Sequence, residues 1–219
     1  MVPFSFAGED FLIMGQGALF WPARKALLIA DLHLEKASFF ARFGQMLPPY
    51  DSNATLAAIE ALVDETGARE LWCLGDSFHD GEGPFRLDEQ ARRRLLTLTA
   101  RLDWTWITGN HDPLTAAPGG RVLDEACLHG ICLRHETLGS DRRPEISGHW
   151  HPKLRMRVRG QNLSRRCFVH APGRLILPAF GAFTGGMRAD DPAITRAVGT
   201  PAEALVPANG RLLRFPLAG

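Results

Sequence analysis

The apolar positions in the first half of the chain alternate between strand-like runs and helix-like spacing. Apolar runs rich in β-branched or aromatic residues predict strands at residues 11–14, 26–30, 70–74 and 104–107. A helix is expected to begin at Asp51 and Ser52, which can cap it, because the apolar residues that follow recur at helical spacing. A second helix is expected from about residue 87 to residue 99. This alternation favours an α/β layered core.

The second half of the chain has shorter apolar segments, separated by glycine, proline and asparagine. These segments predict strands at residues 122–128, 131–136, 145–147, 153–159, 167–170 and 174–177. Short strands with turn residues between them are typical of antiparallel hairpins. A mixed sheet packed on a second sheet, with helices outside, is the simplest arrangement. We expect one domain spanning residues 1–219, since single α/β domains commonly reach this length.

The composition fits a globular protein, with 45% hydrophobic and 22% charged residues. No targeting signal or membrane-spanning apolar run is visible in the sequence, so the expected location is the cytoplasm. The cysteines form no CxxC pair, and each lies in an apolar stretch, which predicts buried free thiols in a reducing compartment. They are Cys73, Cys127, Cys132 and Cys167.

The formal net charge is only +1, but the charge is unevenly distributed. Residues 146–189 contain no Asp or Glu. The same segment carries Lys153, Arg155, Arg157, Arg159, Arg165, Arg166, Arg174 and Arg188. A basic segment without acidic residues suggests a polyanionic substrate. The alternative is a solvated strand face that binds no ligand.

Five short motifs, far apart in the sequence, carry side chains that bind metals. They are DLH at residues 31–33, GDSFH at 75–79, GNHD at 109–112, an isolated His135, and GHWH at 148–151. Asp31, Asp76 and Asn110 each follow a predicted strand, and ligands of α/β sheets collect beyond the carboxyl ends of strands. His149 and His151 are two residues apart, so on an extended strand they would point the same way and serve adjacent ions.

Carboxylate and amide oxygens combined with imidazole nitrogens suit manganese, iron or zinc. We expect two divalent ions, with manganese favoured and iron and zinc left open. His129 competes with His135 as the isolated ligand, but His135 follows a predicted strand and is the better candidate. His129 and His170 are expected to be hydrogen-bonded structural histidines.

The five motifs resemble those of the binuclear metallophosphoesterase (calcineurin-like) superfamily. Members carry D-x-H, GD-x-x-[DH], GNH-[DE], an isolated His and GHxH in this order, and the match covers about residues 29–152. The resemblance implies a four-layer α/β/β/α sandwich of two mixed sheets. The chain is too short for the capping domain of larger nucleases in the superfamily, so we expect an open site.

The resemblance also implies a role for each motif residue. Asp31, His33 and His151 would hold one metal, Asn110, His135 and His149 the other, and Asp76 would bridge both. Two such ions can activate a bridging hydroxide and clamp the phosphate oxygens during in-line displacement. His111 would approach the scissile phosphate without binding metal. We interpret His111 as the acid or charge stabiliser, with His79 as its partner or a second phosphate contact.

Further segments narrow the resemblance. His79 stands where phosphoprotein phosphatases typically carry Asp, and the GDxFH form is similar to DNA double-strand-break repair nucleases of the superfamily. Residues 31–36, 148–152 and 178–187 resemble bacterial ligase-associated DNA damage response endonucleases. The resemblance therefore implies a manganese-dependent endonuclease acting in DNA repair, on single-stranded or flapped DNA. A DNA ligase and a helicase of the same pathway are the implied partners.

The basic segment begins with a period-two pattern. Lys153, Arg155, Arg157 and Arg159 alternate with apolar residues, so on a strand all four cations would share one face. The strand starts just after the last metal-binding motif, so it could follow a nucleic-acid backbone away from the metals. We hypothesise that it contacts phosphates, which would make binding weaken steeply with salt. Trp150 could stack on a base or pack in the interior.

Two other functions stay open at this point. The same metal site would suit a phosphomonoesterase or a cyclic-nucleotide phosphodiesterase acting on small substrates. The chain could also be a catalytically inert interaction module. Such a module would usually have lost metal ligands, and none is missing from the five motifs.

Overall fold

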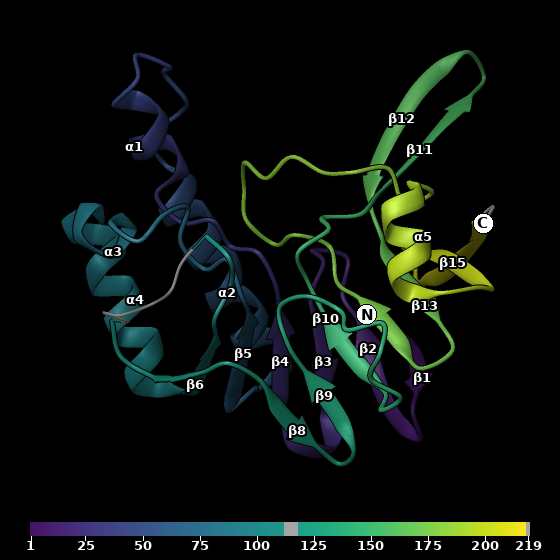
Figure 1. Cartoon of the computed structure of the whole chain (residues 1–219). Helices are drawn as coiled ribbons and strands as arrows, with labels where there is room; N and C mark the ends of the chain where they lie inside the picture. Colours follow the sequence, from purple (N-terminus) through teal and green to yellow (C-terminus); the bar gives the residue numbers. More distant parts are fainter. Residues whose placement is uncertain (112–117, 218–219) are drawn as a thin grey trace.

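The computed structural model describes residues 1–111 and 118–217, so Asp112 of the GNHD motif lies outside the described residues. Two seven-stranded sheets form the centre of the molecule, and helices lie against both outer faces (Figure 1). This is the expected four-layer α/β/β/α arrangement of two mixed sheets. The described residues contain no separate capping domain.

The first sheet has the strand order β1-β2-β3-β4-β5-β6-β7. Its strands are β1 (Val2–Phe6), β2 (Glu9–Ile13), β3 (Leu19–Trp21), β4 (Ala26–Ile29), β5 (Glu70–Leu74), β6 (Asp103–Ile107) and β7 (Arg121–Leu123). Strands β1 to β4 pair antiparallel, whereas β4 to β7 pair parallel. The carboxyl ends of β4, β5 and β6 therefore meet at one edge.

The second sheet has the order β16-β15-β13-β14-β10-β9-β8. Its strands are β8 (Ala126–Leu128), β9 (Ile131–Leu133), β10 (Glu145–Ser147), β13 (Phe168–Ala171), β14 (Arg174–Ile176), β15 (Ala202–Ala208) and β16 (Arg211–Leu217). Strand β10 pairs parallel with both β9 and β14, and the other pairs are antiparallel. Strands β11 (Lys153–Val158) and β12 (Gln161–Arg166) form a separate hairpin, which projects from the body of the molecule (Figure 1).

The helices are α1 (Lys36–Ala41), α2 (Asp51–Thr66), α3 (Gly83–Arg86), α4 (Glu89–Arg101) and α5 (Pro192–Val198), with a 3-10 turn η1 (Pro22–Arg24). Helices α2 and α4 pack their apolar residues on the first sheet. Helix α5 packs Ile194 and Val198 on the outer face of the second sheet. The inner faces of the two sheets enclose the core between them, which includes Trp21 and Phe168.

Three strand expectations need correction. The segment 122–128 is not one strand, because β7 belongs to the first sheet and β8 to the second. The segment 153–159 ends at Val158, since Arg159 and Gly160 form the two-residue turn to β12 with φ of 49° and 82°. Such tight turns need left-handed backbone at both positions. Strand β10 lies between parallel neighbours and is not part of a hairpin.

Asp51 and Ser52 begin α2 as expected, but their side chains do not cap it. The Asp51 carboxylate accepts a hydrogen bond from the Ala37 backbone N–H at 2.9 Å. The Ser52 hydroxyl accepts one from the Glu35 N–H at 2.8 Å and donates to the Glu35 carboxylate at 2.7 Å. The side chains of Asp51 and Ser52, at the start of α2, thus bind Glu35 and Ala37 at the start of α1. The start of α2 therefore anchors α1.

Cys127, Cys132 and Cys167 are free thiols, as expected. Cys73, Cys132 and Cys167 are buried, but Cys127 is exposed at the surface-facing strand β8. The prediction of burial is therefore wrong for Cys127, because β8 lies at the edge of the second sheet. Among the described residues, no helix is both long and apolar enough to cross a membrane.

Adjacent leucines of α4 offer a test of the packing. Leu95 is 0% exposed against the first sheet, whereas Leu96 is 44% exposed. We expect Leu95→Ala to lower the free energy of unfolding by about 2–5 kcal/mol, because it leaves a cavity in the core. Leu96→Ala, the matched control, should change it by less than about 0.5 kcal/mol. Urea unfolding measures both, and equal effects of the two variants would contradict the packing described here.

Candidate metal centre

The two sheets bring their donor side chains to one shared edge. In the first sheet, Asp31 lies just beyond β4 and Asp76 just beyond β5, and the Asp31 N–H donates to Gly75 O at 3.2 Å. In the second sheet, His135 follows β9, and the Gly148 N–H after β10 donates to His135 O at 2.9 Å. The parallel strands in each sheet therefore deliver carboxylate and imidazole groups to the same place.

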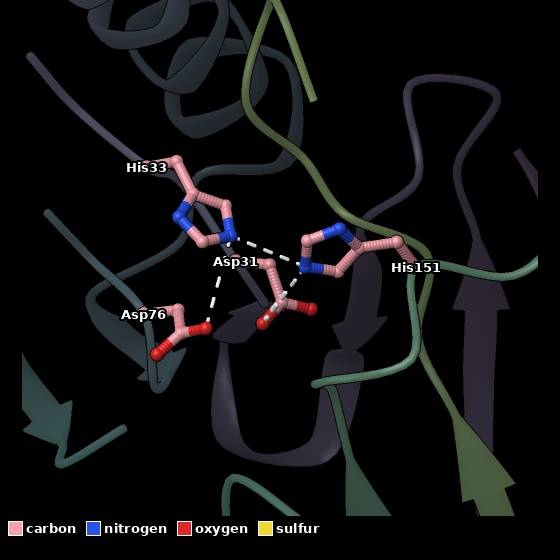
Figure 2. A group of neighbouring side chains, drawn as sticks. All are labelled: Asp31, His33, Asp76 and His151. Carbon is pink, nitrogen blue, oxygen red and sulfur yellow. Dashed lines mark hydrogen bonds and ion pairs between the residues drawn. The ribbon is translucent and has the colours of Figure 1, made fainter. Parts of the chain in front are cut away.

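Four side chains form the first donor group, which is drawn in Figure 2. Asp31, His33, Asp76 and His151 each offer one ligand atom, and these atoms all lie within 4.8 Å of one another. The Nε2 atoms of His33 and His151 are 3.2 Å apart. His151 Nε2 is 3.6 Å from Asp31 Oδ1, and His33 Nε2 is 3.8 Å from Asp76 Oδ2. The side chains point toward a common centre.

Three further side chains form the second donor group beside it. Asn110 Oδ1 lies 2.8 Å from His135 Nε2 and 3.1 Å from His149 Nδ1. The two imidazole nitrogens are 3.1 Å apart. The Oδ1 atom of Asp76 is 3.5 Å from His135 Nε2, while its Oδ2 atom faces His33. Asp76 thus faces both groups with different oxygens, which is the geometry that a bridging ligand needs.

The protonation of the histidines suits metal binding. His135 Nδ1 lies 3.1 Å from Leu74 O, an acceptor that fixes the proton on Nδ1 and leaves the Nε2 lone pair for a ligand bond. Burial, helped by the charge of His151, lowers the pKa of His33 to about 2. Burial also lowers the pKa of His149. Imidazole nitrogens, carboxylates and an amide oxygen that converge in this way fit divalent ions of the manganese, iron and zinc class.

The backbone around the donors is strained. Left-handed φ values occur at Asp31 (53°), His33 (44°), Glu35 (64°), Asp76 (46°), His149 (71°) and His151 (47°). Left-handed backbone costs a residue with a side chain roughly 1–2 kcal/mol. Strain of this kind concentrates at functional sites, where the surrounding structure enforces it. The left-handed backbone at the donor residues therefore supports a functional role for the two donor groups, independently of their side chains.

His149 and His151 reach the site differently from the expectation. Both lie in the loop between β10 and β11, not on an extended strand. Each has left-handed backbone, so the two-residue alternation of a strand does not apply. His149 turns to the second donor group and His151 to the first. The two side chains lie in neighbouring donor groups, but strand alternation is not what brings them there.

Two glycines make room for the donors. A Cβ atom on Gly75 would lie 2.2 Å from His135 Nδ1. A Cβ atom on Gly148 would lie 2.6 Å from the Ala30 Cβ and 2.7 Å from Asp31 Oδ2. No side chain fits at either position unless the site shifts, so both motif glycines are needed for close approach.

His111 and His79 lie beside the first donor group. Their rings stack at 5.9 Å between centroids with an interplanar angle of 13°. The His33 ring is 5.5 Å from His111 and 5.6 Å from His79. His111 is exposed, and its backbone N–H donates to Asp76 Oδ1 at 3.0 Å. Burial, together with the charges of Lys36 and His111, lowers the pKa of His79. Both imidazoles can therefore meet a substrate held at the donor groups.

Three other candidate residues, His129, His170 and Trp150, make contacts that stabilise the fold. His129 lies in the β8–β9 turn, 3.1 Å from Glu9 Oε1, and His170 lies 3.0 Å from Glu203 Oε1. Trp150 is half-buried and packs against the core under α5, so a packing role is favoured over base stacking.

The basic segment divides into a surface part and a structural part. On the β11–β12 hairpin, Arg155 and Arg157 are exposed and line an open depression of about 600 Å³. Lys153 is half-buried and donates to Thr184 O at 3.2 Å, and exposed Arg159 lies in the turn.

Two arginines of the segment face inward instead. Arg166 donates to Phe180 O at 3.0 Å, and Arg174 pairs with Glu145 at 3.1 Å. Both stabilise the fold, so the whole segment is not one polyanion-binding surface.

A family model and solved structures are similar to this chain. The family model of the calcineurin-like phosphoesterases matches residues 24–163. The crystal structure of the Pseudomonas putida nuclease MPE has a TM-score of 0.75 and 30% sequence identity, with 98% of each chain covered. The Escherichia coli phosphoesterase Yfce has a TM-score of 0.42 and 14% identity, with 88% of this chain and 99% of that chain covered. A search of curated protein sequences gave no significant match.

A substitution at Gly148 tests the geometry of the metal centre. We expect Gly148→Ala to weaken metal binding by about 10- to 100-fold, the usual cost of disturbing the groups that orient metal ligands. The added methyl group would displace Asp31, which supplies one of the donors. Gly139→Ala is the matched control, since its Cβ atom would meet open space. Titration with Mn²⁺ by calorimetry measures both variants, and unchanged affinity in Gly148→Ala would contradict the close packing at Asp31.

Proposed function

Because the chain belongs to the calcineurin-like phosphoesterase family, we propose that it is a DNA endonuclease that cleaves single-stranded or flapped DNA. Family membership establishes a metal-dependent hydrolase of phosphoesters. The choice of DNA is supported by the 30% identity, over almost the whole length of both chains, to a protein described as a nuclease.

The observation that carries the proposal is the connection between the donor groups and the β11–β12 hairpin. His151 of the first donor group is followed two residues later by Lys153, where β11 begins. Arg155 and Arg157 continue along the same strand, and their cross-strand neighbours are Ser164 and Asn162. Cations and hydrogen-bond donors that lead away from a phosphoesterase centre suit a substrate with several phosphates. A small phosphomonoester would leave this surface without a role.

We assign the donors in two sets. Asp31, His33 and His151 would hold one ion, Asn110, His135 and His149 the other, and Asp76 would contact both. When bound, the ions would supply Lewis acidity toward the phosphate oxygens and lower the pKa of a water molecule. Manganese is our proposed metal, and the donor set is also compatible with iron or zinc.

Two histidines would complete the reaction. His111 is exposed beside the donor groups, so its imidazole can donate a proton to the leaving sugar oxygen. His79 stacks against His111 and would orient it or contact the phosphate. The backbone N–H of His111 holds Asp76, so a change in the His111 side chain leaves that contact intact.

We further propose a place for this activity in the cell. The sequence segments that resemble ligase-associated endonucleases support a role in DNA repair in the cytoplasm, beside a DNA ligase and a helicase.

A circular single-stranded DNA incubated with the protein and Mn²⁺ tests the proposed function. An endonuclease converts the circle to linear products. Hydrolysis of small phosphoesters alone would favour a phosphomonoesterase or a cyclic-nucleotide phosphodiesterase. A protein that takes up no metal and hydrolyses neither substrate would be an inert interaction module.

The two parts of the site should respond differently to substitution. We expect His111→Ala to lose about 10²–10⁴-fold in turnover, the usual contribution of a positioned acid, while it retains its metal. Asp76→Ala should lose both turnover and metal, because its two oxygens face both donor groups. Metal analysis of the purified variants decides between these outcomes, with His129→Ala as the control histidine outside the site. A His111→Ala protein devoid of metal would show that His111 is a ligand.

The β11–β12 hairpin should contribute phosphate contacts. Reversing the charge at Arg155 and Arg157, to Glu, should weaken binding of single-stranded DNA. Two lost contacts would lower the slope of log affinity against log salt by about 1.4. Arg92→Glu with Arg93→Glu makes the same change on the exposed face of α4 and serves as the control. An unchanged slope in the Arg155 and Arg157 variant would mean that the hairpin takes no part in DNA binding.

A further inference from the structure

A row of phenylalanines leads outward from the donor groups along α1 and the turn that follows it. We call Phe39, Phe40 and Phe43 the α1 aromatic strip. The Phe39 ring lies 4.6 Å from His79 and 5.3 Å from Phe43, and the Phe40 ring lies 5.4 Å from His79. Since His79 stacks on His111, aromatic rings run without a break from the site to the surface.

The three phenylalanines of the strip are not part of the hydrophobic core. Phe43 is 65% exposed, and Phe39 and Phe40 are half-buried. None of the three belongs to the hydrophobic core clusters found among the described residues. Three large apolar side chains gathered on the surface beside a catalytic site indicate a binding surface more strongly than scattered exposed residues do.

The base of the strip is fixed in place. Helix α1 begins three residues after His33, and the Ala37 N–H donates to the buried Asp51 carboxylate. The guanidinium of Arg86, the last residue of α3, donates a hydrogen bond to the Ser38 hydroxyl at 3.0 Å. A rigid aromatic surface loses little conformational entropy when it binds a ligand. The part of the strip on α1, Phe39 and Phe40, is thus preorganised relative to the first donor group.

A lysine side chain lies beside the rings of the strip. Lys36 Nζ lies 6.0 Å from the centroid of the Phe40 ring. Figure 1 shows α1 and the β11–β12 hairpin projecting from the same end of the molecule on opposite sides. A polyanion held at the donor groups would have cations on both sides.

We propose that the α1 aromatic strip stacks an unpaired base of the DNA strand, next to the phosphate that is cleaved. This inference rests on the proposed function and specifies how single-stranded DNA would be selected. Stacking on a side chain needs a free base face, whereas a base in a duplex has both faces covered by its neighbours. The strip starts at His79, where a phosphate is expected, and Lys36 adds positive charge. An apolar partner such as a lipid or a protein would need neither the cation nor the continuity with the site.

The substitution Phe43→Ala tests the proposal, because an exposed side chain can be removed without unfolding the protein. Stacking one base on an aromatic side chain changes affinity by roughly 5- to 150-fold on alanine substitution. We expect a loss of this size in kcat/KM on single-stranded DNA, mainly through KM. The bound metal should stay as in the wild type. Phe43→Trp should retain DNA cleavage, whereas Phe43→Leu, which is apolar but has no ring, should not.

Phe85→Ala is the matched control, since Phe85 is 68% exposed on the neighbouring helix α3 and no ring contact joins it to the strip or to His79. It should cleave DNA as the wild type does. A DNA substrate with an abasic position next to the cleaved phosphate provides a second test of the stacking proposal. The wild type should cleave it more slowly than the normal strand, and Phe43→Ala should cleave both equally.

The outcomes separate the two proposals. If the wild type does not cleave single-stranded DNA, the proposed function fails and takes the stacking proposal with it. If the wild type cleaves DNA but Phe43→Ala or Phe43→Leu cleaves it equally well, only the stacking proposal is overturned. A loss in Phe43→Ala that persists in full on the abasic substrate also overturns it, because no base is then present to stack.

Discussion

Two buried carboxylates set the requirement on which the rest of the site is built. Asp31 and Asp76 are 0% and 2% exposed, and within the described part of the chain their ion pairs are with His33, His135 and His151. A buried carboxylate without sufficient countercharge costs several kcal/mol. Divalent cations between these groups would remove the cost. Metal binding would then stabilise the folded state by mass action, as for any ligand that binds only the native protein.

The fold meets this requirement through the direction of its strands. Parallel strands in both sheets end at the same edge, so carboxylates from β4 and β5 meet imidazoles that follow β9 and β10. The chain must then turn sharply, which explains the left-handed backbone at Asp31, Asp76 and His149. It also explains why Gly75 and Gly148 have no room for a side chain. Strain and lost side chains at these points are offset by burial elsewhere in the two sheets.

The fold class and the gathering of the seven donors could be predicted from the sequence, because a polar residue that follows an apolar strand marks the carboxyl edge. The loop geometry of His149 and His151 could not, since histidine gives no local sign that it will adopt left-handed backbone. The inward orientation of the half-buried Arg166 could not be predicted either, because its carbonyl partners come from the loop that contains Phe180 and Gly181. The hairpin of β15 and β16 was not expected either, because Pro207 and Pro216 interrupt the strand pattern, although prolines are tolerated near a sheet edge.

In our proposal, a nucleic-acid strand contacts the two donor groups, the β11–β12 hairpin and the α1 aromatic strip, and all three contacts depend on where the metals bind. Anomalous diffraction from a crystal grown with Mn²⁺ tests this directly. We expect two peaks in each chain, one among Asp31, His33, Asp76 and His151 and the other among Asp76, Asn110, His135 and His149. A lone peak, or a second ion held without His135 and His149, would contradict it.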